Sequence, residues 1–157
     1  MTGELSALFK EEPQRNAPEG YRWVAGARKS DIAWDVMKEF RRNEATELFR
    51  QREAWFNAGQ VPAEYTGWIR IVEDGLVSYG DYLYRKGENL ETYLHNIGIS
   101  EGCQYPVSVF ACVDADGWAD QGWGDSECQA EERFNKVSNF IEKQSDDTLL
   151  VSVDCHC

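Results

Sequence analysis

Apolar residues recur at helical spacing between Ser30 and Gly59, and this is the clearest pattern in the chain. Ser30 is a good N-cap residue, Asp31 suits a first helical turn, and Gly59 is a good stop. The phase drifts near residues 42–43, which leaves open one long helix or two helices joined there. The apolar positions, which predict a core-facing stripe, are Ile32, Val36, Met37, Phe40, Leu48, Trp55 and Phe56.

Shorter patterns flank this helix. Before it, the sequence predicts a short helix in residues 1–12 around Leu5, Leu8 and Phe9, a Pro- and Gly-containing loop over 13–20, and a short strand over 21–25. After it, the predicted elements are a strand over 68–72, a turn at Asp74-Gly75, a hairpin partner over 76–84, and a short helix over 88–97 that ends at Gly98.

The last third of the sequence predicts a strand, a second strand that completes a hairpin, a helix and a final strand. These elements cover residues 106–113, 118–123, 127–144 and 148–155, with a hairpin turn at Asp116-Gly117 and a capping box from Ser126 to Gln129. The order resembles half of a ferredoxin-like fold (β-β-α-β). We therefore expect one α+β domain over residues 1–157, with a single antiparallel or mixed sheet covered by helices. Its expected parts are an N-terminal helix and loop (1–20), a helical part (21–60) and a sheet-containing part (61–157).

Length and composition suit a single folded domain. The chain has 157 residues, of which 42% are hydrophobic and 13% aromatic, enough for a core. No apolar run approaches the ~20 residues of a membrane span, and residues 1–5 do not start a signal peptide. Five Cys without a Cys-x-x-Cys pair favour reduced thiols. A cytoplasmic protein without membrane contact is expected.

The net charge of −12 is unevenly distributed. Residues 1–60 contain ten bases and ten acids, whereas residues 61–157 contain six bases and eighteen acids. Eight acids and no base lie between Glu101 and Glu132. Such a field repels nucleic acid and attracts basic surfaces, so we expect a basic protein as partner and no direct nucleic-acid contact. An acidic surface that only aids solubility is the alternative.

Two clusters resemble metal sites. Asp114, Asp116 and Asp120 surround a tight turn and have oxygen ligands that Ca²⁺ or Mg²⁺ favours, but they depart from the EF-hand pattern. Asp-Gly is a favoured turn sequence without any ligand, so the turn accounts for these residues and we expect no cation there. A metal-dependent enzyme using these three carboxylates remains the alternative.

The second cluster is Cys155-His156-Cys157, with His95, Cys103 and Cys128 as further candidate ligands. On a strand the two thiols share a face with Val151 and Val153 while His156 faces the other way, which favours buried thiols over zinc. The chain also lacks a Gly-x-Ser-x-Gly elbow, a P-loop and a dinucleotide-binding Gly pattern. Neither a metal, a cofactor nor an enzymatic activity is expected.

Tyr and Trp next to acids are typical of recognition surfaces for basic partners. Tyr82, Trp118 and Trp123 are the candidate apolar anchors. The full candidate partner-binding set is Tyr82, Asp114, Asp116, Trp118, Asp120, Trp123, Asp125 and Glu127.

The end of the chain resembles the C-terminal part of a family of small uncharacterised proteins from bacteriophages and bacteria. The segments that carry the resemblance are residues 146–156, Asp116-Gly117-Trp118 and Gly122-Trp123-Gly124. The resemblance covers about residues 107–157 and implies a phage or mobile-element origin. By analogy with acidic anti-defence proteins that imitate DNA, it implies an inhibitor of a host nucleic-acid-binding defence protein. An accessory or immunity-type interaction protein is a further alternative.

Overall fold

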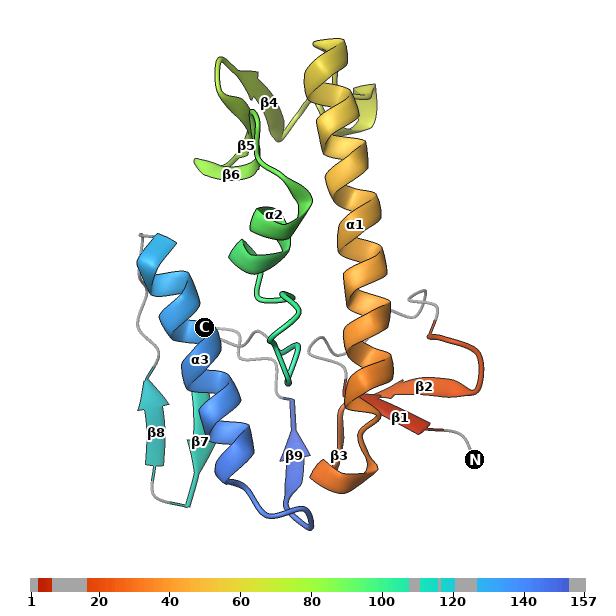
Figure 1. Ribbon diagram of the computed structural model, residues 1–157, viewed down its shortest axis with the longest axis vertical. Helices are drawn as coiled ribbons and strands as arrows, with labels where there is room; N and C mark the ends of the chain where they lie inside the picture. The colour runs from red at the N-terminus through yellow and green to blue at the C-terminus, as the bar shows by residue number, and fades with distance from the viewer. Residues whose placement is uncertain (1–2, 7–16, 108–110, 116, 121–126, 153–157) are drawn as a thin grey trace.

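The computed structural model describes residues 3–6, 17–107, 111–115, 117–120 and 127–152, which combine helices with short strands in an α+β fold (Figure 1). The helices are α1 (Trp34–Ala58), α2 (Leu90–Asn96) and α3 (Glu127–Lys143), and 3₁₀ turns cover Lys29–Asp31 and Ala63–Tyr65. The strands are β1 (Gly3–Ser6), β2 (Tyr21–Val24), β3 (Gly26–Arg28), β4 (Ile69–Val72), β5 (Gly75–Ser78), β6 (Asp81–Arg85), β7 (Ala111–Asp114), β8 (Gly117–Asp120) and β9 (Leu149–Val151).

The described strands form four small sheets, so the prediction of a single sheet is wrong. β1 pairs with β2 in parallel, whereas β3–β9, β4–β5–β6 and β7–β8 are antiparallel. The ferredoxin-like pairing is not confirmed, because β9 pairs with β3 and not with β7 or β8. Backbone bonds from Lys29 N to Thr148 O (2.9 Å) and from Ser152 N to Ala25 O (2.7 Å) extend the β3–β9 pairing at both ends.

The N-terminal segment is extended where a helix was predicted. Residues 3–6 form β1, in register with β2 through pairs such as Leu5 opposite Trp23. Pairing with a distant strand therefore overrides the local helical pattern, while Leu8 and Phe9 lie outside the described residues.

Helix α1 is one continuous helix, which resolves the alternative left open by the drifting phase. It begins four residues after Ser30, which lies in the 3₁₀ turn, so the predicted N-cap is wrong. Gly59 ends it as predicted, with φ of 65° and its N–H donated to Phe56 O. The phase drifts because Trp34 packs against one core cluster and Phe49 against another.

The segment after α1 is a three-stranded meander, where two strands were predicted. The predicted partner strand breaks at Tyr79-Gly80 into β5 and β6, and Gly75 is the first residue of β5. Leu76 and Tyr84 of the meander pack against α1 and α2 in the first core cluster. The second cluster joins Tyr105 and Cys112 to the α3 residues Val137 and Ile141.

Helices α2 and α3 lie close to their predicted positions. Asn89 caps α2 by accepting a 2.9 Å hydrogen bond from Thr92 N. Helix α3 ends one residue before its predicted end, and Val137 and Ile141 of its predicted stripe are buried. Ser126 of the predicted capping box lies outside the described residues.

Candidate functional site

The acidic hairpin predicted from Asp116-Gly117 is present as β7 and β8, with Asp114 opposite Gly117 and Val113 opposite Trp118. Asp114 is exposed at the end of β7. Asp116, Trp123 and Asp125 lie outside the described residues, and Trp118, Asp120 and Glu127 are described by their backbone alone. Trp118 and Asp120 lie on β8, and Glu127 is the first residue of α3.

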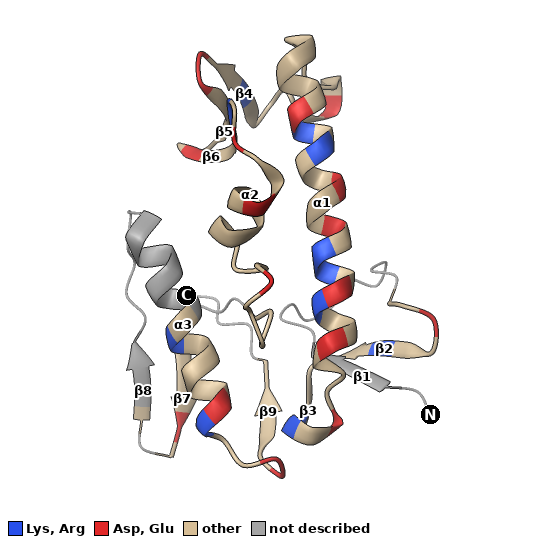
Figure 2. Ribbon diagram, viewed as in Figure 1, with Lys and Arg blue, Asp and Glu red and all other residues tan. Residues whose placement is uncertain are grey.

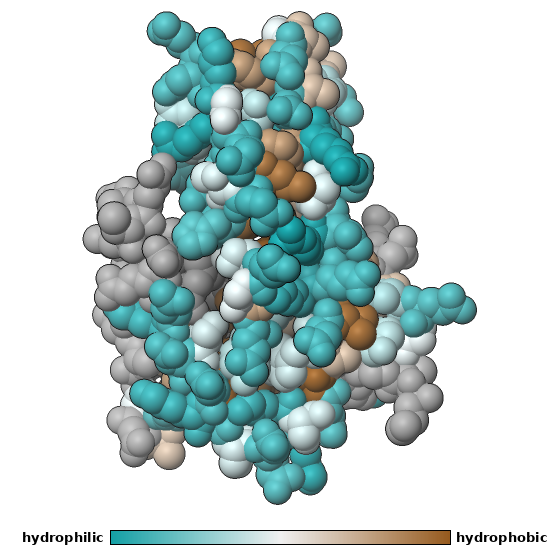
Figure 3. All heavy atoms as spheres, in the orientation of Figure 1, coloured by the Kyte–Doolittle hydropathy of each residue, from teal (hydrophilic) through white to brown (hydrophobic). Residues whose placement is uncertain are grey.

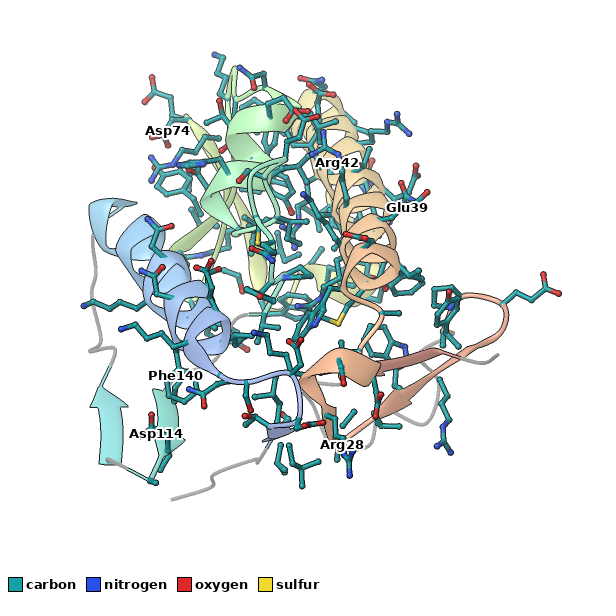
Figure 4. The ribbon with its side chains drawn as sticks, turned by 60° about the horizontal axis from the view of Figure 1, so that its bottom comes forward. Arg28, Glu39, Arg42, Asp74, Asp114 and Phe140 are labelled. Atoms are coloured by element: carbon teal, nitrogen blue, oxygen red, sulfur yellow. The ribbon has the colours of Figure 1, made fainter. Side chains whose placement is uncertain are left out.

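Tyr82 belongs to a different part of the molecule. It lies on β6, donates a 2.6 Å hydrogen bond to the Asp74 carboxylate, and stacks under the Arg85 guanidinium at 4.1 Å from the ring centroid. The hydrogen bond to Asp74 raises the pKa of the Tyr82 phenol. Figure 4 shows Asp74 and Asp114 well apart, so the structure does not bring Tyr82 to the acidic hairpin.

The strand face that was expected to bury the C-terminal thiols is exposed as far as it is described. Leu149 and Val151 are 63% and 58% exposed, so the described part of this face does not support the expected burial of Cys155 and Cys157. Leu150, on the opposite side of β9, packs against the α3 cluster, and alternation turns its neighbours away. Val153, Cys155, His156 and Cys157 lie outside the described residues.

Two described thiols are poor candidates for nucleophiles. Burial raises the pKa of Cys103, whose thiol donates to Tyr105 O at 3.3 Å. Burial also raises the pKa of Cys112, and the Asp114 carboxylate adds to this shift. A higher thiol pKa leaves less of the reactive thiolate at neutral pH.

Within the described ranges, no group of three or more His, Cys, Asp and Glu side chains is arranged to hold a metal ion. For the complete chain we expect no stoichiometric zinc by elemental analysis and no saturable rise in melting temperature with Ca²⁺ or Mg²⁺. A bound cation would stabilise the folded state, so a saturable rise that Asp116→Asn abolishes would contradict this expectation.

Four of the five bases of α1 contact other parts of the molecule, a feature that the sequence analysis missed, whereas Arg50 is exposed and pairs with Glu47 on the same helix. Arg41 donates to Pro106 O at 2.8 Å, and Arg52 donates to Leu83 O and the Tyr93 hydroxyl at 3.0 and 2.8 Å. Lys38 donates to the backbone oxygen of Glu101. Arg42 pairs with Glu91 at 2.6 Å. These contacts tie α1 to segments 31 to 65 residues away in sequence.

Lys29 makes a similar contact before α1. Its ammonium group donates to Gln144 O at 2.8 Å and to Glu142 O at 3.2 Å, at the carboxyl end of α3. The ammonium also lies 5.9 Å from the Tyr105 ring centroid, and the side chain is only 12% exposed. A cation there satisfies terminal carbonyls and offsets the negative end of the helix dipole.

Three of the five acids of α1 are exposed, whereas Glu44 and Glu53 are partly buried. Asp35, Glu39 and Glu47 are exposed, and Figure 4 shows Glu39 pointing away from the body of the molecule. In the second half, every Asp and Glu whose side chain is described is exposed except Glu88, which is partly buried. Figure 2 shows the acids distributed over several of the described elements and the loops between them.

The spacing of the charged residues along α1 indicates which of them lie on the same face as the buried residues. Positions three or four apart lie on one face of a helix. Lys38, Arg41, Arg42 and Arg52 share the phase of the buried residues Ala45 and Phe49. The exposed acid Glu47 lies on the opposite face, and Asp35 and Glu39 lie beside the inner face. The balanced charge of residues 1–60 therefore conceals an inner face of α1 that is rich in bases and three acids that are exposed to solvent.

None of the described helices is long and apolar enough to cross a membrane. Comparisons with models of protein families, with curated proteins and with solved structures find no match to this chain.

Proposed function

We propose that this protein is a non-enzymatic, acidic binding protein that recognises a basic surface on a nucleic-acid-binding protein. The observation that carries the proposal is the segregation of charge. Lys29, Lys38, Arg41, Arg42 and Arg52 donate hydrogen bonds into the body of the protein, while most of the described carboxylates face solvent. A basic partner that approaches from solvent then meets carboxylates first.

The acidic hairpin and the segment that follows it supply the strongest local charge in the proposal. Residues 101–132 contain eight acids and no base, and Glu101 and Asp114 of this set are exposed. Regularly exposed carboxylates imitate the phosphates of DNA, and a field of one sign accelerates encounter with a basic cleft. Trp118 and Trp123 would act as the apolar anchors, because buried aromatic rings dominate the energy of many interfaces.

The resemblance of residues 107–157 to small phage and bacterial proteins suggests which class of partner to propose. An acidic protein of that origin would inhibit a host defence protein by occupying its nucleic-acid site. This part of the proposal rests on analogy between acidic proteins. Tyr82 is not included in the proposed surface, since it lies on the meander with Asp74.

The test uses a basic partner recovered from a bacterial lysate on the immobilised protein. Replacing Asp114, Asp116, Asp120 and Asp125 by Asn should slow its association about tenfold at low salt, with a smaller change in dissociation, because dispersed charges mainly steer encounter. Trp118→Ala and Trp123→Ala should instead speed dissociation. Stopped-flow or surface-plasmon kinetics over a salt series would measure both effects.

The matched control removes similar charge from another face, through Asp35→Asn, Glu39→Gln and Glu47→Gln on α1. We expect this variant to slow association less than the quadruple Asn variant does, because the proposed contact surface is the acidic hairpin and the segment after it. Equal slowing by both variants would show that total charge acts without a defined surface. An unchanged rate for the quadruple Asn variant would refute the proposal.

A further inference from the structure

Strands β7 and β9 each turn one face toward helix α3. Cys112 of β7 and Leu150 of β9 both pack in the cluster that contains the α3 residues Val137 and Ile141. Figure 4 shows both strands below α3. Because successive side chains of a strand point to opposite faces, each strand turns its second face away from α3.

This second face is apolar and open to solvent. Val113 follows Cys112 and is 53% exposed. Leu149 and Val151, on either side of Leu150, are exposed to a similar extent. We call Val113, Leu149 and Val151 the outer face. On the side of the molecule drawn in Figure 3, hydrophilic residues cover most of the surface and apolar residues form only small separate patches. Exposed apolar residues that gather on one face mark interaction sites.

The register of the β7–β8 hairpin connects the outer face with the acidic surface proposed above. Trp118 of β8 is directly opposite Val113 of β7. Residues directly opposite each other in antiparallel strands lie on the same face of the sheet. The register therefore assigns Trp118, one of the two proposed apolar anchors, to the face of Val113.

Exposed carboxylates border one end of the outer face. The end of β7 and the start of β9 lie at the same end of the molecule (Figure 1), and Figure 2 shows acids at both places. These acids are Asp114 on β7 and Asp146 and Asp147 in the turn before β9, and all three are exposed.

Two bases lie near these carboxylates. Arg28, which is opposite Leu149, pairs with Asp147 at 3.8 Å and is exposed. Lys29 lies 4.0 Å from Asp146, but its mostly buried ammonium group is bound at the carboxyl end of α3. Among these residues, three exposed acids therefore stand against one exposed base.

An apolar centre with a charged rim is typical of a protein interface. The charge of this rim favours one occupant. A second copy of the chain would bring a further net charge of −12 to an acidic surface, so repulsion opposes that arrangement. The occupant that fits is a basic partner with apolar side chains among its bases.

We propose that the outer face is the apolar centre of the surface that binds the basic partner. Val113, Leu149 and Val151 cover apolar side chains of the partner, and the three carboxylates at the end of the face contact its bases. The inference rests on the proposed function for the charge of the partner, and it extends the contact surface from the hairpin to β9. Charge alone would admit any basic surface, whereas an apolar centre distinguishes among basic partners.

Two short synthetic peptides of equal length and charge test this requirement for apolar side chains. One peptide alternates Lys with Leu, and the other alternates Lys with Ser. The Leu peptide should bind the full chain about tenfold more tightly, because its apolar side chains leave water on the outer face. Both affinities should fall as salt rises, since both peptides carry bases. Fluorescence anisotropy of the labelled peptides would measure the affinities.

Leu149→Thr combined with Val151→Thr is the decisive variant. Thr favours strands as Val does, so the fold should be kept, and thermal unfolding would check this. The advantage of the Leu peptide should fall below about threefold, while the Ser peptide should bind as before. Leu48→Gln, which alters an exposed apolar residue on α1, is the matched control and should keep the full advantage.

Equal affinity of the two peptides, an advantage that the double Thr variant keeps, or a loss of the advantage in Leu48→Gln would each overturn the inference. A dimer in sedimentation equilibrium that the double Thr variant dissociates would also overturn it, because a second copy would then occupy the outer face. The proposed function fails separately. An unchanged association rate of the quadruple Asn variant with the partner would refute that function and leave the peptide result standing.

Discussion

Gly75→Ala should lower the free energy of unfolding by about 3 kcal/mol, the upper part of the range for overpacked sites. A Cβ atom on Gly75 would lie 2.1 Å from the backbone oxygen of Tyr84 and 3.2 Å from a ring carbon of Tyr82. A backbone oxygen cannot swing aside as a side chain can, so β5 and β6 would have to separate. The ladder already shifts register between Leu76 and Val77 on β5.

The loss would spread beyond the meander because Tyr84 belongs to the core. Its ring lies 5.6 Å from Phe49 and 5.7 Å from Phe56, both on α1. Urea denaturation followed by tryptophan fluorescence would measure the change. Gly67→Ala is the matched control, since nothing lies within 4 Å of a Cβ there, and it should change stability by less than about 0.5 kcal/mol. Equal midpoints for Gly75→Ala and the original protein would contradict the strand geometry.

Lys29→Met should destabilise the protein by about 2 kcal/mol, the size expected for a hydrogen-bonded, mostly buried cation at a helix end. The substitution keeps most of the side-chain volume. It removes the bonds to Glu142 O and Gln144 O, which couple the 3₁₀ turn before α1 to the end of α3. Because the Lys29 side chain is only 12% exposed, the loss should persist at high salt.

The neighbouring residue gives the control for this prediction. Arg28 pairs with Asp147 at 3.8 Å, but its side chain is 64% exposed and that of Asp147 is 91% exposed. Exposed ion pairs contribute little, so Arg28→Met should cost less than about 0.5 kcal/mol. Thermal and urea unfolding of the two variants would compare them directly. Equal effects would mean that Lys29 acts only as a surface charge.

Local signals in the sequence predicted where helices and strands form better than they predicted which strands pair. The stop at Gly59, the extent of α3 and the β7–β8 hairpin follow from short-range chemistry and agree with the structure. The pairing of β1 with β2 and of β3 with β9 depends on contacts across long stretches of chain. No local pattern specifies those partners, which is why a helix was predicted at β1 and one sheet was predicted where four form.

The charge pattern illustrates the same limit at the candidate site. The acidic excess lies after residue 60, whereas the charges of residues 1–60 sum to zero. The total does not show that Asp35, Glu39 and Glu47 of α1 are exposed, because exposure depends on how the helix packs in the fold. Tyr82 was grouped with the acidic hairpin by composition, whereas the fold assigns it to the meander.

The central claim is that the protein presents negative charge to a partner in place of DNA, and competition tests it most directly. The basic partner recovered on the immobilised protein is bound to a fluorescent DNA duplex, and anisotropy is followed as this protein is added. We expect displacement of the duplex, and we expect direct binding of the partner to this protein to weaken from about 50 mM to about 200 mM salt. The quadruple Asn variant should need a higher concentration to displace the DNA. Recovered partners that are not basic, or a duplex that stays bound when this protein is saturating, would contradict the account.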